Sequence, residues 1–285
     1  MNTPVSYFGG KMKLAKWIIS HFPPHKRYIE VFGGGAAVLF AKDPSPFELY
    51  NDLDHNLFNF FQVLSNPMFY KDFERIIFLT PYSRELYYKA RGKLKSISVT
   101  EALAFLGFEK VQRAVDFFIT VRQCMSGDIN GGWKFTKDIR NNCAGGVGRW
   151  LSAVNRLPEA AERLIRVQIE NQHFRKLIPN YDDPETLFYL DPPYTNSERK
   201  SGGYKCEMTE EDHEELIEIL HCIQGTAVLS GYSNKTYKSL ETDGWKLKTK
   251  KTICSAAVRS RKSKLQGKGS GRRQSRVECL WIKDW

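Results

Sequence analysis

One of the most apolar stretches of this chain ends in an acid, two prolines and a tyrosine. The stretch reads LFYLDPPY and places Asp191, Pro192 and Tyr194 directly after apolar residues. Proline has no backbone N–H and cannot continue a central sheet, so we expect a buried strand that stops at Asp191 and a stiff loop after it. This corner offers a carboxylate, proline carbonyls and an aromatic face, which suits it to receive N–H groups beneath a flat ring. The alternative is an ordinary Pro-Pro turn with a helix-capping Asp191.

A glycine run after a second apolar stretch indicates a nucleotide site. Residues 28–40 read YIEVFGGGAAVLF, which predicts a strand, a glycine loop and a helix start. Such a loop lets a ligand approach the backbone at the N-terminus of the helix. The next strand ends in Asn51-Asp52, about twenty residues after the first, where an acid reaches ribose hydroxyls in this kind of unit. Together these residues predict an adenosine-containing ligand, whereas Asp52 alone could equally cap a helix that begins near His55.

Alternating strands and helices must position these motifs. The periodicity predicts a helix over 11–20 and strands over 27–32 and 46–52, followed by a largely helical region from about Leu57 to Leu164. Within that region, residues 125–149 form a Gly- and Asn-rich stretch around Trp133 that we expect to be a loop. Alternation then resumes with segments that share strand-like or amphipathic helical patterns: strands at 166–171, 186–191, 225–233, 245–253 and 277–282, and an acidic helix at 209–220. We predict one α/β sheet domain built from residues 1–56 and 166–285, interrupted by a helical insertion at 57–165.

The charge of the chain is concentrated in one segment. The formal net charge is +11, and residues 246–276 contain twelve Lys or Arg and no Asp or Glu, so 11 − 12 leaves about −1 for the remainder. The segment precedes a strand-like stretch, VECLWI, so we expect a basic loop between two strands rather than a solvated tail. A tethered cationic loop suits a phosphate backbone.

Other features of the composition narrow the class of protein. The 285 residues suffice for one large domain or one domain with a sizeable insertion. We expect a cytoplasmic protein, because no segment has signal-peptide or membrane-span character. The six cysteines form no C-x-x-C pair, so neither a zinc site nor a disulfide framework is indicated, and we expect no metal.

Four motifs occur in an order that resembles a known enzyme family. YFGGK (7–11), EVFGGGAAV (30–38), YND (50–52) and DPPY (191–194) are similar to the motifs of Dam-type DNA adenine-N6 methyltransferases, which use S-adenosylmethionine. The later segments MTEEDHEEL, LSGYSNKTY and RVECLWI also resemble sequences of that family. One departure is Ala36, where many members carry the second glycine of an F-x-G-x-G pattern. The resemblance implies a Rossmann-like class I methyltransferase sheet with an inserted, mainly helical target-recognition domain.

The resemblance also implies roles for individual residues. The cofactor contacts would be Tyr7, Lys11, Phe32, Gly33, Gly34, Asp52 and Asp191. Asp191 and the carbonyl of Pro192 would each accept one hydrogen of the adenine amine, which directs the nitrogen lone pair towards the methyl sulfonium. The base would be flipped out of double-stranded DNA, and Tyr194 would stack on it.

The DNA contacts are less specified by the sequence. The insertion offers Arg113, Arg122, Gln123, Asn130, Lys134 and Arg140 as candidates for base or phosphate contacts, and of these we favour Arg122, Lys134 and Arg140. In the basic loop we expect Arg259, Arg261 and Lys262 to contact DNA. The resemblance further implies methylation at a short DNA sequence, as in restriction-modification.

Three other functions compete with adenine methylation. An amino methyltransferase acting on cytosine N4 or on a glutamine amide could use a similar acceptor geometry, but Asp at position 191 and the motif order favour adenine. A non-catalytic nucleic-acid-binding protein would explain the basic loop without the cofactor motifs. A dinucleotide oxidoreductase would explain the glycines without DPPY.

Overall fold

A computed structural model describes the chain except residues 8, 97, 99–104, 126, 128, 141, 194–206, 254–274 and 285. The side chains of residues 140, 235, 253 and 275 are also outside the description. Tyr194, Arg259, Arg261 and Lys262 therefore lie outside the described residues, and for Arg140 only the backbone is described. Among the described residues, no helix combines the length and the apolar character needed to cross a membrane.

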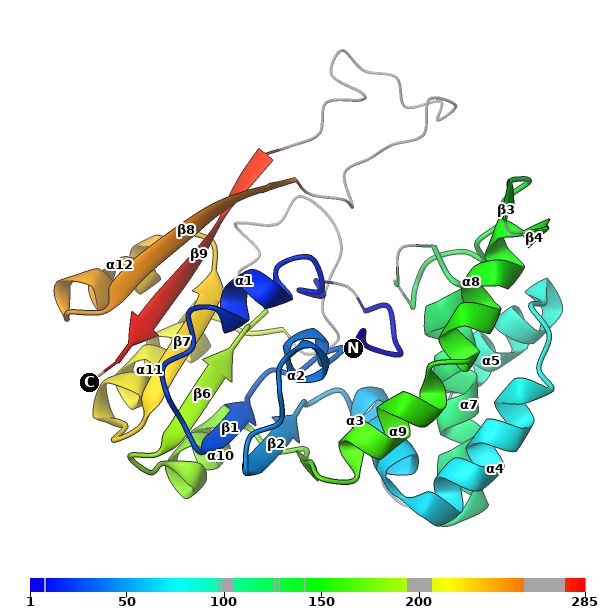
Figure 1. Ribbon diagram of the computed structural model, residues 1–285, viewed down its shortest axis with the longest axis horizontal. Coiled ribbons are helices and arrows are strands. Elements are labelled where there is room, and N and C mark those ends of the chain that lie inside the picture. The colour runs from blue at the N-terminus through cyan, green and yellow to red at the C-terminus, as the bar shows by residue number, and fades with distance from the viewer. Residues whose placement is uncertain are drawn as a thin grey trace.

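A seven-stranded sheet forms one end of the molecule, and a group of helices forms the other (Figure 1). The strand order is β5-β2-β1-β6-β7-β9-β8, in which β9 runs antiparallel to both of its neighbours and the other pairs are parallel. The chain winds outwards from β1 in one direction and from β6 in the other, so the order reverses between these two central strands. In open α/β sheets this reversal point is where ligands bind, at the carboxyl ends of the strands.

The strands of the large sheet have the following bounds: β1 (Arg27–Glu30), β2 (Phe47–Asn51), β5 (Gln168–Glu170), β6 (Thr186–Leu190), β7 (Thr226–Gly231), β8 (Lys246–Ile253) and β9 (Ser275–Lys283). Central β6 and β7 are buried at every position, which explains their apolar sequences TLFYL and TAVLSG. A separate two-stranded sheet pairs β3 (Ile139–Arg140) with β4 (Cys143–Ala144).

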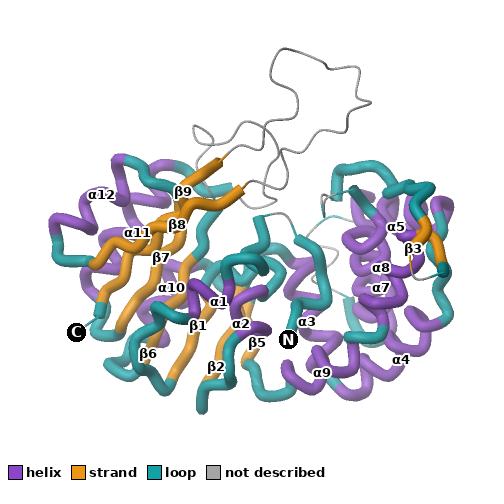
Figure 2. The backbone as a smooth tube through the Cα atoms, turned by 45° about the horizontal axis from the view of Figure 1, so that its top comes forward, coloured by secondary structure: helices purple, strands orange, loops and turns teal. Residues whose placement is uncertain are grey.

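Helices cover both faces of the sheet (Figure 2). On one face lie α1 (Ala15–Ile19), α2 (Ala37–Ala41) and α3 (His55–Ser65), whose apolar side chains share a core with Tyr28, Tyr50 and Tyr189. On the other lie α10 (Phe174–Tyr181), α11 (Glu210–Cys222) and α12 (Lys235–Thr242), which pack against Ile29, Leu49 and Phe188. Residues that alternate along β1 and β2 therefore point into different cores, as the period of a strand requires.

The helical end of the molecule continues the first of these cores. Its helices are α4 (Pro67–Phe78), α5 (Arg84–Ser96), α7 (Phe108–Gln123), α8 (Gly145–Val154) and α9 (Leu157–Leu164). Aromatic rings of α3, α4 and α7 interlock there, with Phe60 stacked on Phe118 at 5.7 Å and Phe73 edge-on to both. The prediction that residues 125–149 form only a loop was wrong at its end, since α8 begins at Gly145 and β3 and β4 form a short hairpin.

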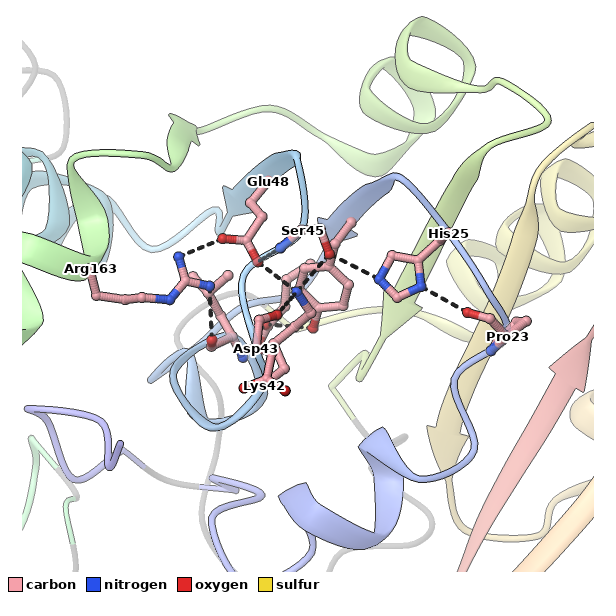
Figure 3. A network of polar contacts seen from close by, with 10 residues as sticks. Pro23, His25, Lys42, Asp43, Ser45, Glu48 and Arg163 are labelled. Carbon is pink, nitrogen blue, oxygen red and sulfur yellow. Dashed lines mark hydrogen bonds and ion pairs between the residues drawn. The ribbon is translucent and has the colours of Figure 1, made fainter.

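A buried ion-pair cluster joins this helical end to the sheet near the amino end of β2 (Figure 3). Lys42 Nζ lies 2.6 Å from Glu48 Oε1, and Arg163 Nη1 of α9 lies 2.5 Å from Glu48 Oε2. Ser45 adds a hydroxyl that accepts from Lys42 at 2.8 Å. We call Lys42, Glu48 and Arg163 the tether cluster, because it ties α9 to β2 at the edge opposite to the expected ligand site.

Candidate active site

A cleft opens at the carboxyl ends of β1, β2 and β6, at the reversal point of the sheet. It holds about 990 Å³ of space between its walls, with the solvent at its mouth included. Its walls come from segments that are far apart in the sequence: residues 7 and 9–11, 30–35 with 37–38, 51–54, 172–174, then 189, 191 and 193, and finally 207, 208 and 212. All four motifs that the sequence singled out contribute to these walls.

The glycine loop lines the cleft with backbone, and two of its positions require glycine. A Cβ atom at Gly33 would lie 2.2 Å from the ring of Tyr50, and Gly34 has a φ of +49°. The hydroxyl of Tyr50 donates to the Gly34 carbonyl at 2.8 Å, which fixes the loop. Phe32 packs against Phe174 of α10 at 5.9 Å and forms an apolar part of the wall.

Ala36 shows the cost of the departure from the F-x-G-x-G pattern. It precedes α2 with φ 54° and ψ 36°, a left-handed conformation that costs a non-glycine residue about 1–2 kcal/mol. The side chain is fully buried, so the methyl group makes core contacts that offset part of this cost. The loop thus keeps its shape without the second glycine.

Asp52 holds the glycine loop and does not cap the following helix. Its Oδ2 accepts from Gly34 N at 2.7 Å and its Oδ1 from Asp54 N at 2.7 Å. The N-cap of α3 is Asp54, whose carboxylate accepts from Asn56 N at 2.9 Å. The alternative in which Asp52 is the cap was therefore wrong. Tyr7 donates its hydroxyl to Asp54 Oδ2 at 2.8 Å and so joins the N-terminal segment to this wall.

Asn51 was not among the expected site residues, yet its side chain fastens the floor of the cleft. Its amide donates to the carbonyls of Val31 at 2.8 Å and Gln172 at 3.0 Å, and its oxygen accepts from Gln172 N at 2.8 Å. One side chain thus joins the ends of β1 and β2 to the loop before α10. A polar residue at the end of an otherwise apolar strand was the sequence signal.

Asp191 lies at the centre of a second buried ion-pair cluster. Its Oδ1 lies 2.9 Å from Lys11 Nζ and accepts from Ser230 Oγ at 2.9 Å. Lys11 Nζ also lies 2.9 Å from Glu278 Oε1 on β9. We call Lys11, Asp191, Ser230 and Glu278 the cleft cluster. Asp191 does not cap α11, whose N-cap is Thr209.

The two oxygens of the Asp191 carboxylate have different environments. Both donors bond to Oδ1, while the residue remains 19% exposed and lines the cleft. A carboxylate oxygen can accept further hydrogen bonds, so Oδ2 is presented to a ligand. Pro192 follows directly and is buried, and of the two prolines it is Pro193 that lines the cleft. The carbonyl of Pro192 as an acceptor therefore stays a prediction.

Ser230 and Glu278 were not expected as site residues. Ser230 is fully buried near the end of β7, and its hydroxyl also lies 3.3 Å from the hydroxyl of Tyr189. Glu278 is an acid within the apolar strand segment VECLWI, and it is 2% exposed. A charged residue in a buried strand is costly unless it is paired, so its position in the sequence was itself a signal.

Acidic groups dominate the charge of the cleft. Among the described residues, its walls contain Glu30, Asp52, Asp54, Asp191, Glu207 and Asp212, against Lys11 and His173. Burial raises the pKa of Glu30 to about 8, although the hydroxyl of Tyr28 and the backbone N–H of Leu39 both bond to its carboxylate. Such a site favours a ligand that carries positive charge. Among the described residues there is no grouping of three or more His, Cys, Asp or Glu side chains arranged to hold a metal ion.

Four cations gather where the helical end meets the N-terminal segment. Arg122 of α7 donates to Ser6 Oγ at 2.8 Å, next to Tyr7 in the cleft wall. Burial lowers the pKa of Arg122 to about 10, and the charges of Arg156 and Arg149 add to this effect. Burial and the charge of Arg149 likewise lower the pKa of Lys134. We call Arg122, Lys134, Arg149 and Arg156 the junction cations.

Two of the residues in the insertion that we considered as DNA contacts are buried inside the protein. Arg113 is 5% exposed within α7, and Gln123 is fully buried, with its oxygen accepting from Ser83 N and Trp133 Nε1. Neither side chain reaches the surface. α7 is buried at almost every position from Val111 to Gln123, so packing on several sides encloses these two polar side chains.

Comparison with known proteins identifies the family. A search of curated proteins found no match to the sequence. The family model of the D12 class N6 adenine-specific DNA methyltransferases matches residues 7–256, which include the glycine loop, Asp52, Asp191 and most of the helical region. This match excludes the oxidoreductase and the non-catalytic binding protein as alternatives and favours adenine over cytosine. The chain thus belongs to the D12 class of N6 adenine-specific DNA methyltransferases.

Proposed function

We propose that S-adenosylmethionine binds in the cleft and that Asp191 and Pro192 hold the adenine amine for direct methyl transfer. The observation that carries this proposal is the Asp191 carboxylate, fixed through one oxygen and open to the cleft through the other. Membership of an adenine-specific DNA methyltransferase family implies the methyl donor, and the acid-rich cleft suits its net positive charge.

The cofactor would be held by the walls that the sequence predicted. Gly33 and Gly34 leave room for the ligand against backbone, and Phe32 with Phe174 provides an apolar surface. Asp52 would accept from the ribose hydroxyls while its existing bonds to Gly34 and Asp54 keep the carboxylate in place. Tyr7 would act through Asp54 and the glycine loop on which it packs.

Lys11 has ion-pair partners that the sequence did not indicate. It is 7% exposed and paired with Asp191 and Glu278, so we assign it to orienting the catalytic carboxylate. It also lines the cleft, which is compatible with a cofactor contact as well.

The chemical step follows from the acceptors at this corner. The exocyclic amine of adenine is a poor nucleophile, because its lone pair is delocalised into the ring. Hydrogen bonds from its two hydrogens to Asp191 Oδ2 and the Pro192 carbonyl would favour a tetrahedral nitrogen whose lone pair faces the donor methyl group. The proton released after transfer would leave through Asp191 or water. Stacking of the flipped base on Tyr194, which lies outside the described residues, remains a prediction.

DNA would be bound across the junction between the sheet and the helical region. Of the junction cations, Arg122 contacts Ser6, the neighbour of Tyr7 in the cleft wall. The four would contact the backbone phosphates next to the flipped adenine. This assignment keeps Arg122 and Lys134 from the sequence prediction and adds Arg149 and Arg156. The contributions of Arg140 and of the basic loop remain predictions, as does the role of residues 57–165 in selecting a short DNA sequence.

Calorimetry with S-adenosylmethionine tests the cofactor site. Asp52→Ala removes an acceptor and two loop contacts, so we expect weaker binding by about 1.5–3 kcal/mol. Asp72→Ala, on the exposed surface of α4, is the matched control and should bind like the wild type. Unchanged affinity of the Asp52 variant would remove this residue from the cofactor site.

The salt dependence of DNA binding tests the junction cations. Arg149→Gln should reduce the slope of log K against log salt concentration by about 0.9, the value for one phosphate contact. Arg75→Gln, an exposed arginine on α4 that pairs with Asp72, is the control. An unaltered slope in the Arg149 variant would show that this side chain does not contact DNA.

A further inference from the structure

Glu278 shares the ammonium group of Lys11 with Asp191. Both carboxylates lie 2.9 Å from the same Nζ atom, and they come from β9 and from the residue that follows β6. The side chain of Glu278 is 3% exposed and that of Lys11 is 7% exposed, so water screens this arrangement little. Two carboxylates and one ammonium leave one negative charge on the group.

The division of charge matters for the strength of Asp191 as an acceptor. An ammonium that paired with Asp191 alone would neutralise it and would weaken the hydrogen bond that it can accept from the substrate amine. With Glu278 as its second partner, Lys11 is held at Oδ1 while the group as a whole remains negative. That charge faces the cleft, where the attacking nitrogen becomes positive as the methyl group arrives.

The neighbours of the group support the same interpretation. Ser230 donates the second hydrogen bond to Oδ1, and Tyr189 lies behind Ser230 at 3.3 Å. The charged groups here place a surplus of negative charge around one fixed lysine.

We propose that Glu278 is a positioning residue for methyl transfer: it holds Lys11 between two carboxylates and so keeps Asp191 both oriented and negatively charged toward the adenine amine. The inference rests on the proposed role of Asp191. It assigns to β9, at the far side of the sheet from the glycine loop, a part in the chemical step.

Single-turnover methyl transfer measures this role apart from binding. Glu278→Gln keeps the shape and an oxygen for Lys11 but removes the charge, and we expect the rate to fall by about 10- to 100-fold, within the coupling range of groups in one ion-pair network. The dissociation constants for DNA and S-adenosylmethionine should change by less than about threefold. Glu278→Asp should recover most of the rate, because the flexible Lys11 side chain can follow the shortened acid. Glu241→Gln, an exposed acid of α12 that accepts from Trp281, is the matched control and should behave like the wild type.

A double-mutant cycle separates this role from a purely structural one. If Glu278 acts through Lys11, then Glu278→Gln should cause no further loss of rate in a Lys11→Met background. Fully additive losses would overturn the inference, and so would a wild-type rate in Glu278→Gln. Should the amide variant fail to fold, the Asp variant decides: a rate closer to Glu241→Gln than to Lys11→Met supports the role of the charge, and a rate as low as that of Lys11→Met contradicts it.

Asp191→Ala distinguishes the failure of this inference from the failure of the proposed function. If Asp191→Ala is inactive while Glu278→Gln transfers at the wild-type rate, only the role of Glu278 is lost. If Asp191→Ala transfers at the wild-type rate, the proposed site and the inference both fail.

Discussion

The tether cluster and the cleft cluster are built from the same chemistry and differ in what is left open. Both join lysine to buried glutamate, and both connect segments that are distant in the sequence. In the tether cluster, Lys42 and Arg163 take one oxygen each of Glu48, so both carboxylate oxygens are used. In the cleft cluster, both donors of Asp191 bond to Oδ1, and the residue lines the cleft. We propose that its Oδ2 is the atom that a ligand uses.

This difference teaches how a buried ion pair can serve either stability or chemistry. In a closed cluster, the charged groups lose their hydration and pair only with other protein groups, so no charged atom is left for a ligand to contact. An open cluster keeps part of a charge available and has a functional use for it. The variants below should therefore divide into those that affect unfolding and those that affect turnover.

The largest effect on stability is expected at the tether cluster. Glu48→Ala would leave Lys42 and Arg163 buried without their carboxylate, and the loss of one partner of a buried pair costs about 3–5 kcal/mol. Denaturant unfolding measures this change. The control is Asp72→Ala, which removes an exposed i,i+3 pair with Arg75 and should stay within about 0.5 kcal/mol. A similar small effect at Glu48 would contradict the comparison.

The largest effect on turnover is expected at the cleft cluster. Asp191→Ala removes a hydrogen-bond acceptor that acts most strongly in the transition state, so single-turnover transfer should fall by at least about 10²- to 10³-fold. DNA affinity should change far less. Mass spectrometry of the digested DNA should find N6-methyladenine as the wild-type product. A product of N4-methylcytosine would contradict the substrate, and a near-normal rate in the variant would contradict the mechanism.

The pKa of Glu30 is affected by Asp191 of the cleft cluster and by Lys42 of the tether cluster, so the pH dependence of stability provides a further test. This pKa is raised by burial to about 8, with the charge of Asp191 acting in the same direction and that of Lys42 against it. The folded protein thus retains a proton that the unfolded chain loses, and stability should fall as pH rises from about 4.5 to about 8, by up to roughly 1.4 kcal/mol per pH unit.

Glu30→Gln cannot ionise and should flatten this part of the stability curve. Unfolding measured at several pH values between 5 and 8 provides the check, with the exposed Glu159→Gln of α9 as the control. An identical slope in the Glu30 variant and the wild type would show that Glu30 does not titrate in this range.

The smallest effect is expected in the glycine loop. Ala36→Gly relieves a left-handed conformation that costs about 1–2 kcal/mol, but it loses a buried methyl group worth about 0.8 kcal/mol and adds chain entropy to the unfolded state. These terms nearly cancel, so the free energy of unfolding should change by less than about 1 kcal/mol. Gly34→Ala, at a φ of +49°, has no such compensation and should destabilise the protein. A loss above about 2 kcal/mol for Ala36→Gly would contradict this explanation.

The fold was largely predictable because its signals are local. Parallel strands that are buried on both faces require continuous apolar runs. The runs TLFYL and TAVLSG are of this kind, so their position between helical segments predicted buried strands. The glycine positions were also predictable, since a positive φ or a close approach excludes other residues. The family match then confirmed adenine-N6 methylation, which the order of the motifs had indicated.

The cleft cluster was harder to predict, because it depends on strand pairing. Glu278 reaches the site only because β9 is inserted antiparallel between β7 and β8, and no local pattern fixes that register. The same holds for Ser230 beside Asp191, which pairing of β6 with β7 brings together. Arg113 and Gln123 were considered as DNA contacts because polar side chains are usually exposed. Helix packing buries both of them, so here the local sequence was misleading.

The position of Glu278 in the sequence determines when during translation the cleft cluster can be completed. Lys11 is made near the beginning of the chain, and its second carboxylate follows Asp191 by the whole of residues 192–278. At a translation rate of about 5–20 residues per second, this interval lasts about 4–17 seconds. During that time a nascent chain holds the glycine loop and Asp191 but lacks β9. If Glu278 has the proposed role, the full rate of methylation requires that β9 has emerged, and a translation product interrupted before β9 carries the cofactor motifs without the complete cleft cluster.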